Sequence, residues 1–272
     1  MRLDDLRETG NVEDRRGAGG GFAVGGLGLL AIVVISYFFG VDPSQLLNSV
    51  DTGAPVQRNS DAPRADDAAY AFSRKIVGSA EDVWTPILKQ KGVAFTPATL
   101  TVYDNATPTG CGTGMSSAGP FYCPEDNRIY LDLSFFNELS DRFGAPGQFA
   151  QAYVIAHEYG HHIQTLTGTM NGDRSSGAEG GSVRVELQAD CYAGVWANHA
   201  NAQFNILQSG DVEGGLRAAA AVGDDALQKQ SQGYAVPDSF THGTSEQRVR
   251  WFKRGFDSGD LDQCDTFSAR EL

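Results

Sequence analysis

The clearest pattern of apolar positions runs from Pro146 to Thr167. Apolar or small residues recur there at spacings of three or four, at Phe149, Tyr153, Ala156, Gly160 and Ile163. This period is typical of one face of an α-helix. Pro146 suits the first turn of the helix and Gly168 suits its end. After a loop rich in glycine and serine, residues 183–200 (VRVELQADCYAGVWANHA) predict a second strong helix.

Shorter patterns predict the rest of the folded domain. Residues 67–91 predict two helices that break near Gly78, with Ser79 and Asp82 as the capping box of the second. Two short stretches predict strands, TLTVY at residues 99–103 and NRIYLDL at residues 127–133. Further helices are predicted over residues 134–143, 211–221 and 225–231, and from a capping box at Thr244 and Gln247 to Gly259. Helices with a small sheet upstream indicate a mainly helical α+β fold.

One stretch near the start is apolar over the length of a membrane span. Residues 17–41 carry no charge, and residues 21–40 (GFAVGGLGLLAIVVISYFFG) match the roughly 20 apolar residues that cross a bilayer. A buried core helix would carry a polar face. A cleaved signal peptide is the stronger alternative, but its apolar region is normally shorter and ends in small residues, whereas this one ends in Tyr37-Phe38-Phe39. The sequence therefore predicts an uncleaved transmembrane helix at residues 21–40.

Basic residues predict the orientation of this span. Four arginines precede it, at Arg2, Arg7, Arg15 and Arg16, and Arg58 follows it. Positive charge favours the cytoplasmic side. We therefore expect a cytoplasmic tail at residues 1–20, a proline-containing linker at residues 41–67 and an extracytoplasmic domain at residues 68–272, either periplasmic or extracellular.

Charge and cysteine content narrow the possible functions. The net charge of −13 repels phosphate backbones and so argues against nucleic acid as a partner. The four cysteines form no CxxC pair, which gives no support to a four-cysteine zinc site. On an oxidising side of the membrane, Cys111 with Cys123 and Cys191 with Cys264 are plausible disulfides, the first favoured because it closes a short loop. Other pairings, or reduced core thiols, remain open alternatives.

Within the first strong helix lies the sequence His157-Glu158-Tyr159-Gly160-His161. Residues four apart share one helix face, so both imidazoles can bind one zinc ion at about 2.0–2.1 Å. Glu158, beside the first ligand, can act as the catalytic base. The alternative is a pair of histidines with ordinary structural partners.

The second helix offers the third ligand. A downstream histidine ligand is absent, since position 164 is Gln and position 167 is Thr. Glu186 can complete a site with two histidines and one glutamate, and Asp190, four residues on, can accept the free N–H of His157. A solvated acidic stripe is the alternative, but the surrounding helix is mainly apolar, and buried carboxylates need partners.

His242 is the candidate donor to the oxyanion that develops during peptide hydrolysis. It stands in PDSFTHGTSEQRV, in the loop before the last helix, where it could instead be an ordinary loop residue. Arg248 is a weaker candidate and is expected to form an ion pair. We assign no catalytic role to His162 or His199.

Four segments, NVEDRRG, HEYGHH, VELQADCYAGVWA and THGTSEQR, resemble the putative neutral zinc metallopeptidase family of bacteria. The resemblance covers nearly the whole chain. It implies a membrane-bound protein with a gluzincin-type fold, in which the HExxH helix lies under a small sheet and a later helix supplies a glutamate. It supports His157, His161 and Glu186 as ligands, Glu158 as base and Asp190 as the partner behind the site, and it names no substrate.

The sequence thus predicts a membrane-anchored enzyme with one zinc ion per chain. It would hydrolyse peptide bonds with a metal-activated water and Glu158 as general base. The strand at residues 127–133 could hold the substrate, a peptide or protein, by edge pairing. The alternatives are a membrane-anchored interaction or chaperone-like domain with a structural zinc, and a secreted binding domain without metal. Cleavage specificity, oligomeric state and activation are not encoded in any pattern we recognise.

Overall fold

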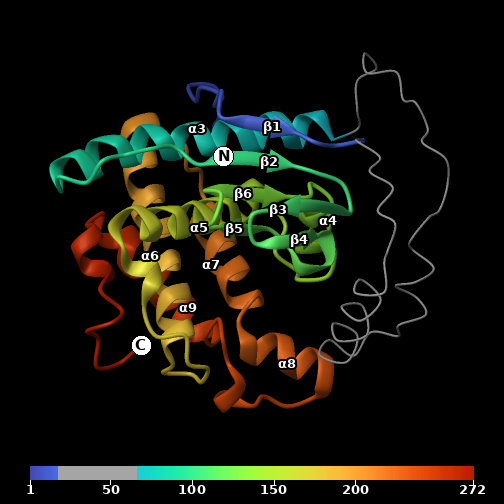
Figure 1. The fold of residues 1–272 in the computed structure, drawn as a ribbon, viewed down its shortest axis with the longest axis vertical. Coiled ribbons are helices and arrows are strands. Elements are labelled where there is room, and N and C mark those ends of the chain that lie inside the picture. Colours follow the sequence, from blue (N-terminus) through green and yellow to red (C-terminus); the bar gives the residue numbers. More distant parts are fainter. Residues whose placement is uncertain (18–65) are drawn as a thin grey trace. The chain divides into compact units, whose positions relative to one another are not determined.

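The small sheet brings together strands from distant parts of the chain. A computed structural model describes residues 1–17 and 66–272, and residues 1–16 and 66–272 belong to one compact unit. Its four-stranded sheet has the order β1 (Val12–Asp14), β2 (Thr99–Val102), β6 (Arg128–Leu131), β5 (Phe121–Cys123). β2 is parallel to β1 and β6, and β5 is antiparallel to β6 (Figure 1).

The strand predicted to pair with a substrate is an inner strand. β6 is bonded to β2 on one side and to β5 on the other, so residues 127–133 offer no free edge and that prediction was wrong. Among the described residues, β1 and β5 are the edge strands of this sheet. A separate hairpin joins β3 (Ala106–Thr109) to β4 (Gly112–Met115).

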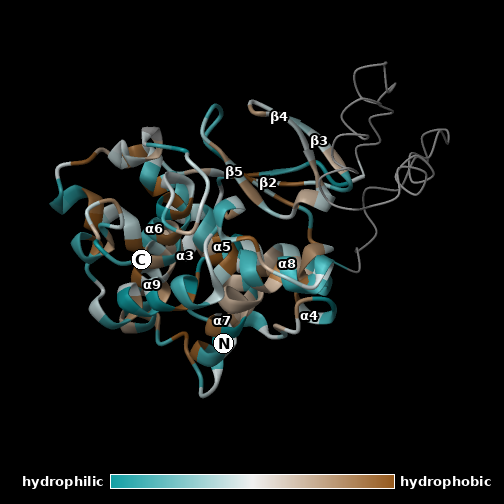
Figure 2. Cartoon of the chain, turned by 90° about the horizontal axis from the view of Figure 1, so that it is seen from below, coloured by the Kyte–Doolittle hydropathy of each residue, from teal (hydrophilic) through white to brown (hydrophobic). Residues whose placement is uncertain are grey.

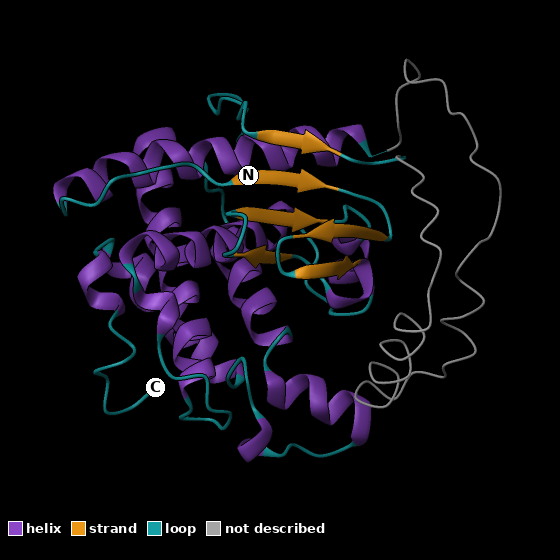
Figure 3. Ribbon diagram, in the orientation of Figure 1, coloured by secondary structure: helices purple, strands orange, loops and turns teal. Residues whose placement is uncertain are grey.

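Helices make up most of the domain, which confirms the mainly helical α+β class (Figure 3). Their bounds are α3 (Asp67–Gln90), α4 (Phe135–Asp141), α5 (Gln148–Thr167), α6 (Gly181–Phe204), α7 (Asp211–Ala221), α8 (Asp224–Gln232) and α9 (Ser245–Ser258). Short 3₁₀ turns include η3 (Pro237–Ser239) and η4 (Leu261–Cys264). The predicted capping box of Thr244 and Gln247 opens α9.

The core lies between α3, α5, α6 and α9. α5 and α6 each carry hydrophobic and hydrophilic residues (Figure 2), and their apolar stripes pack inward. The ring of Phe149 on α5 stacks on Trp196 of α6 with centroids 6.4 Å apart, and Trp84 of α3 meets Tyr192 of α6 at 5.6 Å. These contacts hold α5 and α6 side by side, which is the arrangement that the candidate metal site requires.

The predicted break near Gly78 does not occur, because α3 continues through it. A Cβ at Gly78 would lie 2.5 Å from the backbone oxygen of Arg7, so the glycine leaves room for the N-terminal segment. Ser79 does not cap a new helix; its hydroxyl donates to the carbonyl of Ile76 at 2.7 Å. Glycine inside a helix costs about 1 kcal/mol relative to alanine, and here tertiary packing outweighs that cost.

Residues 1–16 are built into the same unit as the C-terminal domain. The amide of Arg2 donates to Ile206 (2.8 Å), that of Thr9 to Arg74 (3.0 Å), and Asn11 accepts from Leu100 (2.9 Å) before β1 joins β2. The sequence had predicted residues 1–20 as a tail apart from this domain, and the structure differs because β1 completes the sheet.

The predicted membrane span lies outside the described residues, as does nearly all of the predicted linker. Within residues 1–17 and 66–272, no helix has the length and apolar character needed to cross a membrane.

Both predicted disulfides are confirmed. Cys111–Cys123 ties the turn of the β3–β4 hairpin to β5, and Cys191–Cys264 ties α6 to η4. Their Cα atoms lie 5.8 and 5.6 Å apart, within the ordinary range for a disulfide.

Candidate metal centre

The two histidines of the HExxH motif and the glutamate of the second helix converge in the structure. His157 and His161, one turn apart on α5, have ring centroids 4.8 Å apart. Nε2 of His157 lies 3.1 Å from Oε2 of Glu186 on α6, and Nε2 of His161 lies 3.5 Å from Oε1. All three potential ligand atoms lie within 4.8 Å of one another. The structure therefore places the three predicted ligands around one point.

Gly160 allows α5 and α6 to approach this closely. It lies inside the motif, between the two histidines, and faces α6. A Cβ at this position would sit 2.9 Å from the carbonyl oxygen of Ala189 and 3.1 Å from its Cα. A side chain here would push the helices apart and move Glu186 away from the imidazoles. The sequence pattern placed Gly160 on the apolar face, but only the structure gives the reason.

The donor types and charge of the cluster fit a zinc ion. Two imidazole nitrogens and a carboxylate are donors that zinc accepts, and the two Nε2 atoms lie 3.1 and 3.5 Å from the two different oxygens of Glu186. Burial lowers the pKa of His157, but Asp190 and Glu186 raise it to about 10 overall. Two carboxylates thus favour positive charge at this point, which a dication would supply.

Glu158 is buried beside these ligands on α5, with 8% of its surface exposed. Burial raises its pKa, and the positive charge of His157 and His161 opposes this only in part. A carboxylate whose pKa is shifted upward toward neutrality is a better proton acceptor at physiological pH. Its position and environment suit the base predicted from the sequence.

Asp190 stands behind His157, as predicted. Its Oδ1 lies 2.8 Å from Nδ1 of His157 and also accepts from the hydroxyl of Tyr153 at 2.5 Å. Asp190 is fully buried; burial raises its pKa, but Arg248 and His157 outweigh this and hold it below its usual value. An ionised Asp190 accepts the Nδ1 proton and leaves Nε2 of His157 free for a metal.

Arg248 is an ion-pair residue. Its Nε donates to Oδ2 of Asp190 at 2.9 Å and its Nη2 to Oδ1 at 3.0 Å, and Nη2 also contacts the hydroxyl of Tyr153 at 3.2 Å. It is buried with its donors turned to Asp190, which does not favour the weaker suggestion that it contacts a reacting oxyanion. Tyr153 was not predicted as a member of this group, although its position four residues before His157 puts both on one face.

A glutamine stands behind the second histidine. Oε1 of Gln164 lies 2.8 Å from Nδ1 of His161, and its side chain is fully buried. In the sequence, Gln164 was noted only as a position where a further histidine ligand is absent. The signal was present in its spacing, since Gln164 is three residues from His161 on the same helix face.

Asp224, the first residue of α8, holds the loop that carries His242. Its Oδ2 accepts the backbone amides of Thr241, His242 and Gly243 at 2.7, 2.6 and 3.1 Å. Its Oδ1 lies 3.4 Å from Nδ1 of His242, whose side chain is half exposed. No local sequence pattern had indicated this role for Asp224.

The same loop lies against the start of α6. A Cβ at Gly243 would meet side-chain atoms of Val183 and Leu187 at 3.1 and 3.3 Å. Burial lowers the pKa of His242, but Asp224 and the nearby charge of Glu186 outweigh this and raise it. His242 is thus close enough to the cluster to respond to the charge of Glu186.

The other two histidines have structural partners. His162 is buried between the hydroxyl of Tyr122 (3.1 Å) and the carbonyl of Thr96 (2.6 Å). His199 contacts the carbonyl of Gly259 at 2.7 Å.

Comparison with known proteins is consistent with this site. The family model described as putative neutral zinc metallopeptidase matches residues 1–267. The uncharacterized protein YpfJ of Escherichia coli K12 is 48% identical over 98% of this chain and 99% of its own length. An uncharacterized protein of Mycobacterium tuberculosis H37Rv is 41% identical over 86% of this chain and 85% of its own. No solved structure matches the chain.

Proposed function

Because this chain belongs to the putative neutral zinc metallopeptidase family, we propose that it hydrolyses peptide bonds with a zinc ion held by His157, His161 and Glu186. The observation that carries the proposal is the convergence of two imidazole nitrogens and one carboxylate beside Glu158. Three protein ligands are typical of catalytic zinc sites, whereas structural sites generally use four. A buried base beside the ligands also has no purpose in a purely structural site.

Different residues of the chain have different roles in the proposed reaction. When bound, zinc would polarise the scissile carbonyl and lower the pKa of a water molecule. Glu158 accepts the proton of the attacking water and passes it to the leaving amine. Asp190 keeps the Nδ1 proton of His157 in place and so leaves Nε2 free, where it would bind the metal. His242 donates to the oxyanion of the tetrahedral intermediate.

The substrate is a peptide or protein segment in extended form. The open edge of β5 can accept such a segment by strand pairing. β5 packs against α5, where the hydroxyl of Tyr122 contacts His162 at 3.1 Å. An extended peptide on this edge would run beside the helix that carries His157 and His161.

Zinc stoichiometry combined with cleavage of a peptide library tests the proposal. We expect one zinc ion per chain, cleavage that is lost on chelation, and recovery when zinc is returned. Protein that binds no zinc, or that cleaves equally well after complete metal removal, would contradict the proposed function.

Replacing His242 with Leu should lower kcat by about 10²–10³-fold with little change in KM, the range for losing one oxyanion donor. Asp224 and Glu186 raise the pKa of His242 above its usual value, and the contribution of the protonated imidazole is lost as the pH rises through that pKa. The wild-type kcat should therefore fall on the alkaline side, and His242→Leu should lack that fall. His199→Leu is the matched control. An unchanged pH profile in His242→Leu would rule out this role.

A further inference from the structure

Behind His161, two buried glutamines continue the hydrogen bonding away from the metal site. The Nε2 of Gln164 donates to the carbonyl of Val185 at 2.8 Å and to Oε1 of Gln188 at 3.0 Å. The Nε2 of Gln188 in turn donates to the carbonyl of Cys264 at 3.0 Å. Both glutamines are at most 4% exposed, so water does not readily replace these bonds.

The direction of these hydrogen bonds is determined at every step. A side-chain amide has one acceptor oxygen and one donor nitrogen. Because the nitrogen of Gln164 faces two acceptors, its oxygen must face His161, and it can only accept a proton from Nδ1. Likewise, Gln188 can accept from Gln164 only while its nitrogen faces the carbonyl of Cys264. The bonds therefore place the proton of His161 on Nδ1 and leave Nε2 free.

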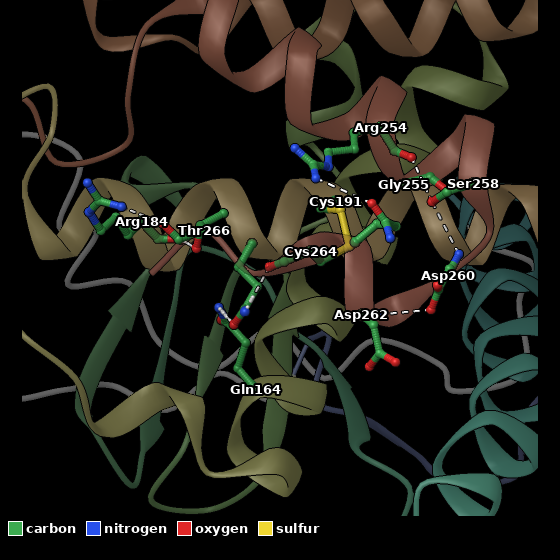
Figure 4. The surroundings of a disulfide bond; sticks show 12 residues. Gln164, Arg184, Cys191, Arg254, Gly255, Ser258, Asp260, Asp262, Cys264 and Thr266 are labelled. Carbon is green, nitrogen blue, oxygen red and sulfur yellow. Dashed lines mark hydrogen bonds between the residues drawn. A yellow bond between two sulfur atoms is a disulfide. The ribbon is translucent and has the colours of Figure 1, made fainter. Parts of the chain in front are cut away.

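The far end of this chain of bonds is held by a disulfide. Cys264 lies in η4 and is joined to Cys191 of α6, and Figure 4 shows Gln164 pointing towards the chain at Cys264. The hydroxyl of Thr266 adds a bond to the carbonyl of Arg184 at 2.7 Å, so the disulfide is not the segment's sole attachment. Its loss should loosen the position of the Cys264 carbonyl without releasing the segment completely.

We infer that Gln164 and Gln188 are positioning residues that link the tautomer of His161 to the Cys191–Cys264 disulfide, so that this disulfide strengthens zinc binding. The inference rests on the proposed function for the identity of the metal. His157 is held by a charged partner, Asp190, whereas His161 depends on neutral amides. Reduction of the Cys191–Cys264 disulfide should therefore disturb the tautomer and orientation of His161 more than those of His157.

Zinc affinity, measured by competition with a chelating dye, tests the link. Gln164→Leu should weaken zinc binding by about 10–100-fold, the range for losing a partner behind a metal ligand. The double variant Cys191→Ser/Cys264→Ser should weaken it less, by about tenfold or under. Cys111→Ser/Cys123→Ser, which removes the disulfide on the β3–β4 hairpin, is the matched control and should leave zinc affinity unchanged.

Non-additive effects of these variants on zinc affinity show whether they act through the same hydrogen bonds. Adding Gln188→Leu to Cys191→Ser/Cys264→Ser should cost little further affinity, because both act on the same bonds. Equal zinc affinity in the Cys191/Cys264 variant and its control would overturn the link. If that variant does not fold, the zinc affinity of Gln188→Leu, which keeps the disulfide, tests the inference instead. An unchanged zinc affinity in Gln188→Leu would overturn it.

A second readout separates this inference from the proposed function. Nitrogen NMR of the metal-free protein should show a slowly exchanging proton on Nδ1 of His161 in the wild type, and its loss in Gln164→Leu. Wild-type protein that binds no zinc but shows this proton would contradict the proposed function and leave the bonding intact. Absence of the Nδ1 proton in the wild type would overturn the positioning role.

The N-terminal segment supports an independent inference about membrane topology. The side chain of Thr9 is fully buried and donates to Oε1 of Glu81 at 2.6 Å. Arg7 binds Glu81 at 2.7 Å and Asp82 at 2.8 Å, and β1 pairs with β2. These bonds require residues 1–16 and the domain from residue 66 onward to occupy the same compartment.

A chain that crosses a membrane once places its two flanks on opposite faces. We infer that residues 1–17 and 66–272 lie on one side of any membrane to which the chain is attached. This inference departs from the topology that the arginine pattern predicted, a cytoplasmic tail with an extracytoplasmic domain. The two disulfides favour the oxidising side for both parts.

Paired cysteine labelling in intact cells tests the topology. Asp5→Cys and Gln230→Cys place a thiol at exposed positions in the N-terminal segment and on α8. Because the native cysteines are paired as disulfides, a membrane-impermeant maleimide should report only the new thiols. We expect the two variants to be both labelled or both protected, and both labelled after permeabilisation. Labelling of one variant alone in intact cells would overturn the inference.

Discussion

Glu158→Gln should keep zinc bound and lower kcat/KM for peptide cleavage by about 10²–10⁴-fold, the contribution expected of a positioned general base. The amide has nearly the same size as the carboxylate but cannot accept the proton of the attacking water. Glu158 has no place among the three converging ligand atoms, so zinc stoichiometry should stay at that of the wild type. Steady-state kinetics on a cleaved library peptide, with zinc measured in the same samples, checks the result.

A surface glutamate provides the control for this experiment. Glu213 on α7 is exposed, and Glu213→Gln should behave as the wild type. Substantial cleavage by zinc-loaded Glu158→Gln would remove Glu158 from the mechanism. Loss of zinc in that variant would instead give Glu158 a role in metal binding.

Arg248→Met should destabilise the protein by about 3–5 kcal/mol, because it removes the guanidinium that pairs with the fully buried carboxylate of Asp190 and bonds both of its oxygens. Oδ1 keeps its bonds to Tyr153 and His157, whereas Oδ2 loses the donor Nε of Arg248. The free energy of unfolding, measured in urea on metal-free protein at neutral pH, gives the effect directly. Zinc binding should also weaken, because Asp190 orients His157.

The destabilisation should depend on pH. The pKa of Asp190 is lowered in the folded wild type, mainly because Arg248 and His157 outweigh burial. Its contribution to stability is therefore present above the unfolded pKa of about 3.9 and is lost as the pH falls through the folded pKa. In Arg248→Met the carboxylate can relieve its burial by taking a proton, so the difference from wild type should shrink as the pH is lowered.

Arg250→Met on the same helix is the matched control. Arg250 is 42% exposed, pairs with exposed Glu246 and Glu271, and donates to the backbone oxygen of Leu272. Exposed ion pairs of this kind are worth about 0–1 kcal/mol each. Equal destabilisation by Arg248→Met and Arg250→Met would contradict the importance of the buried pair.

Local spacing explains why the first parts of the site could be predicted. His157 and His161 share a helix face because they are four residues apart, and Thr244 and Gln247 cap a helix through contacts three residues apart. Glu186 and Asp190 are also four residues apart on one helix. They were predicted because an acidic pair in an apolar helix requires partners. Disulfide pairing also followed from a short loop in one case.

The side chains that hydrogen-bond the site residues could be recognised only partly from the sequence. Gln164 and Tyr153 lie within a turn of a ligand, so their spacing held a usable signal. Asp224 and Gln188 act across elements that are distant in the sequence, and their side chains are common on helix surfaces. No local pattern separates such a residue from a solvated one.

The sequence by itself determined the helical class, the HExxH face, the acidic pair and the cap of α9, because each depends on residues within one or two helical turns. Tertiary structure alone decided that α3 runs through Gly78, that β6 is an inner strand and that residues 12–14 form β1. These features depend on which distant segments share a surface. Hydrogen bonds and close packing between such segments can outweigh a local preference of about 1 kcal/mol.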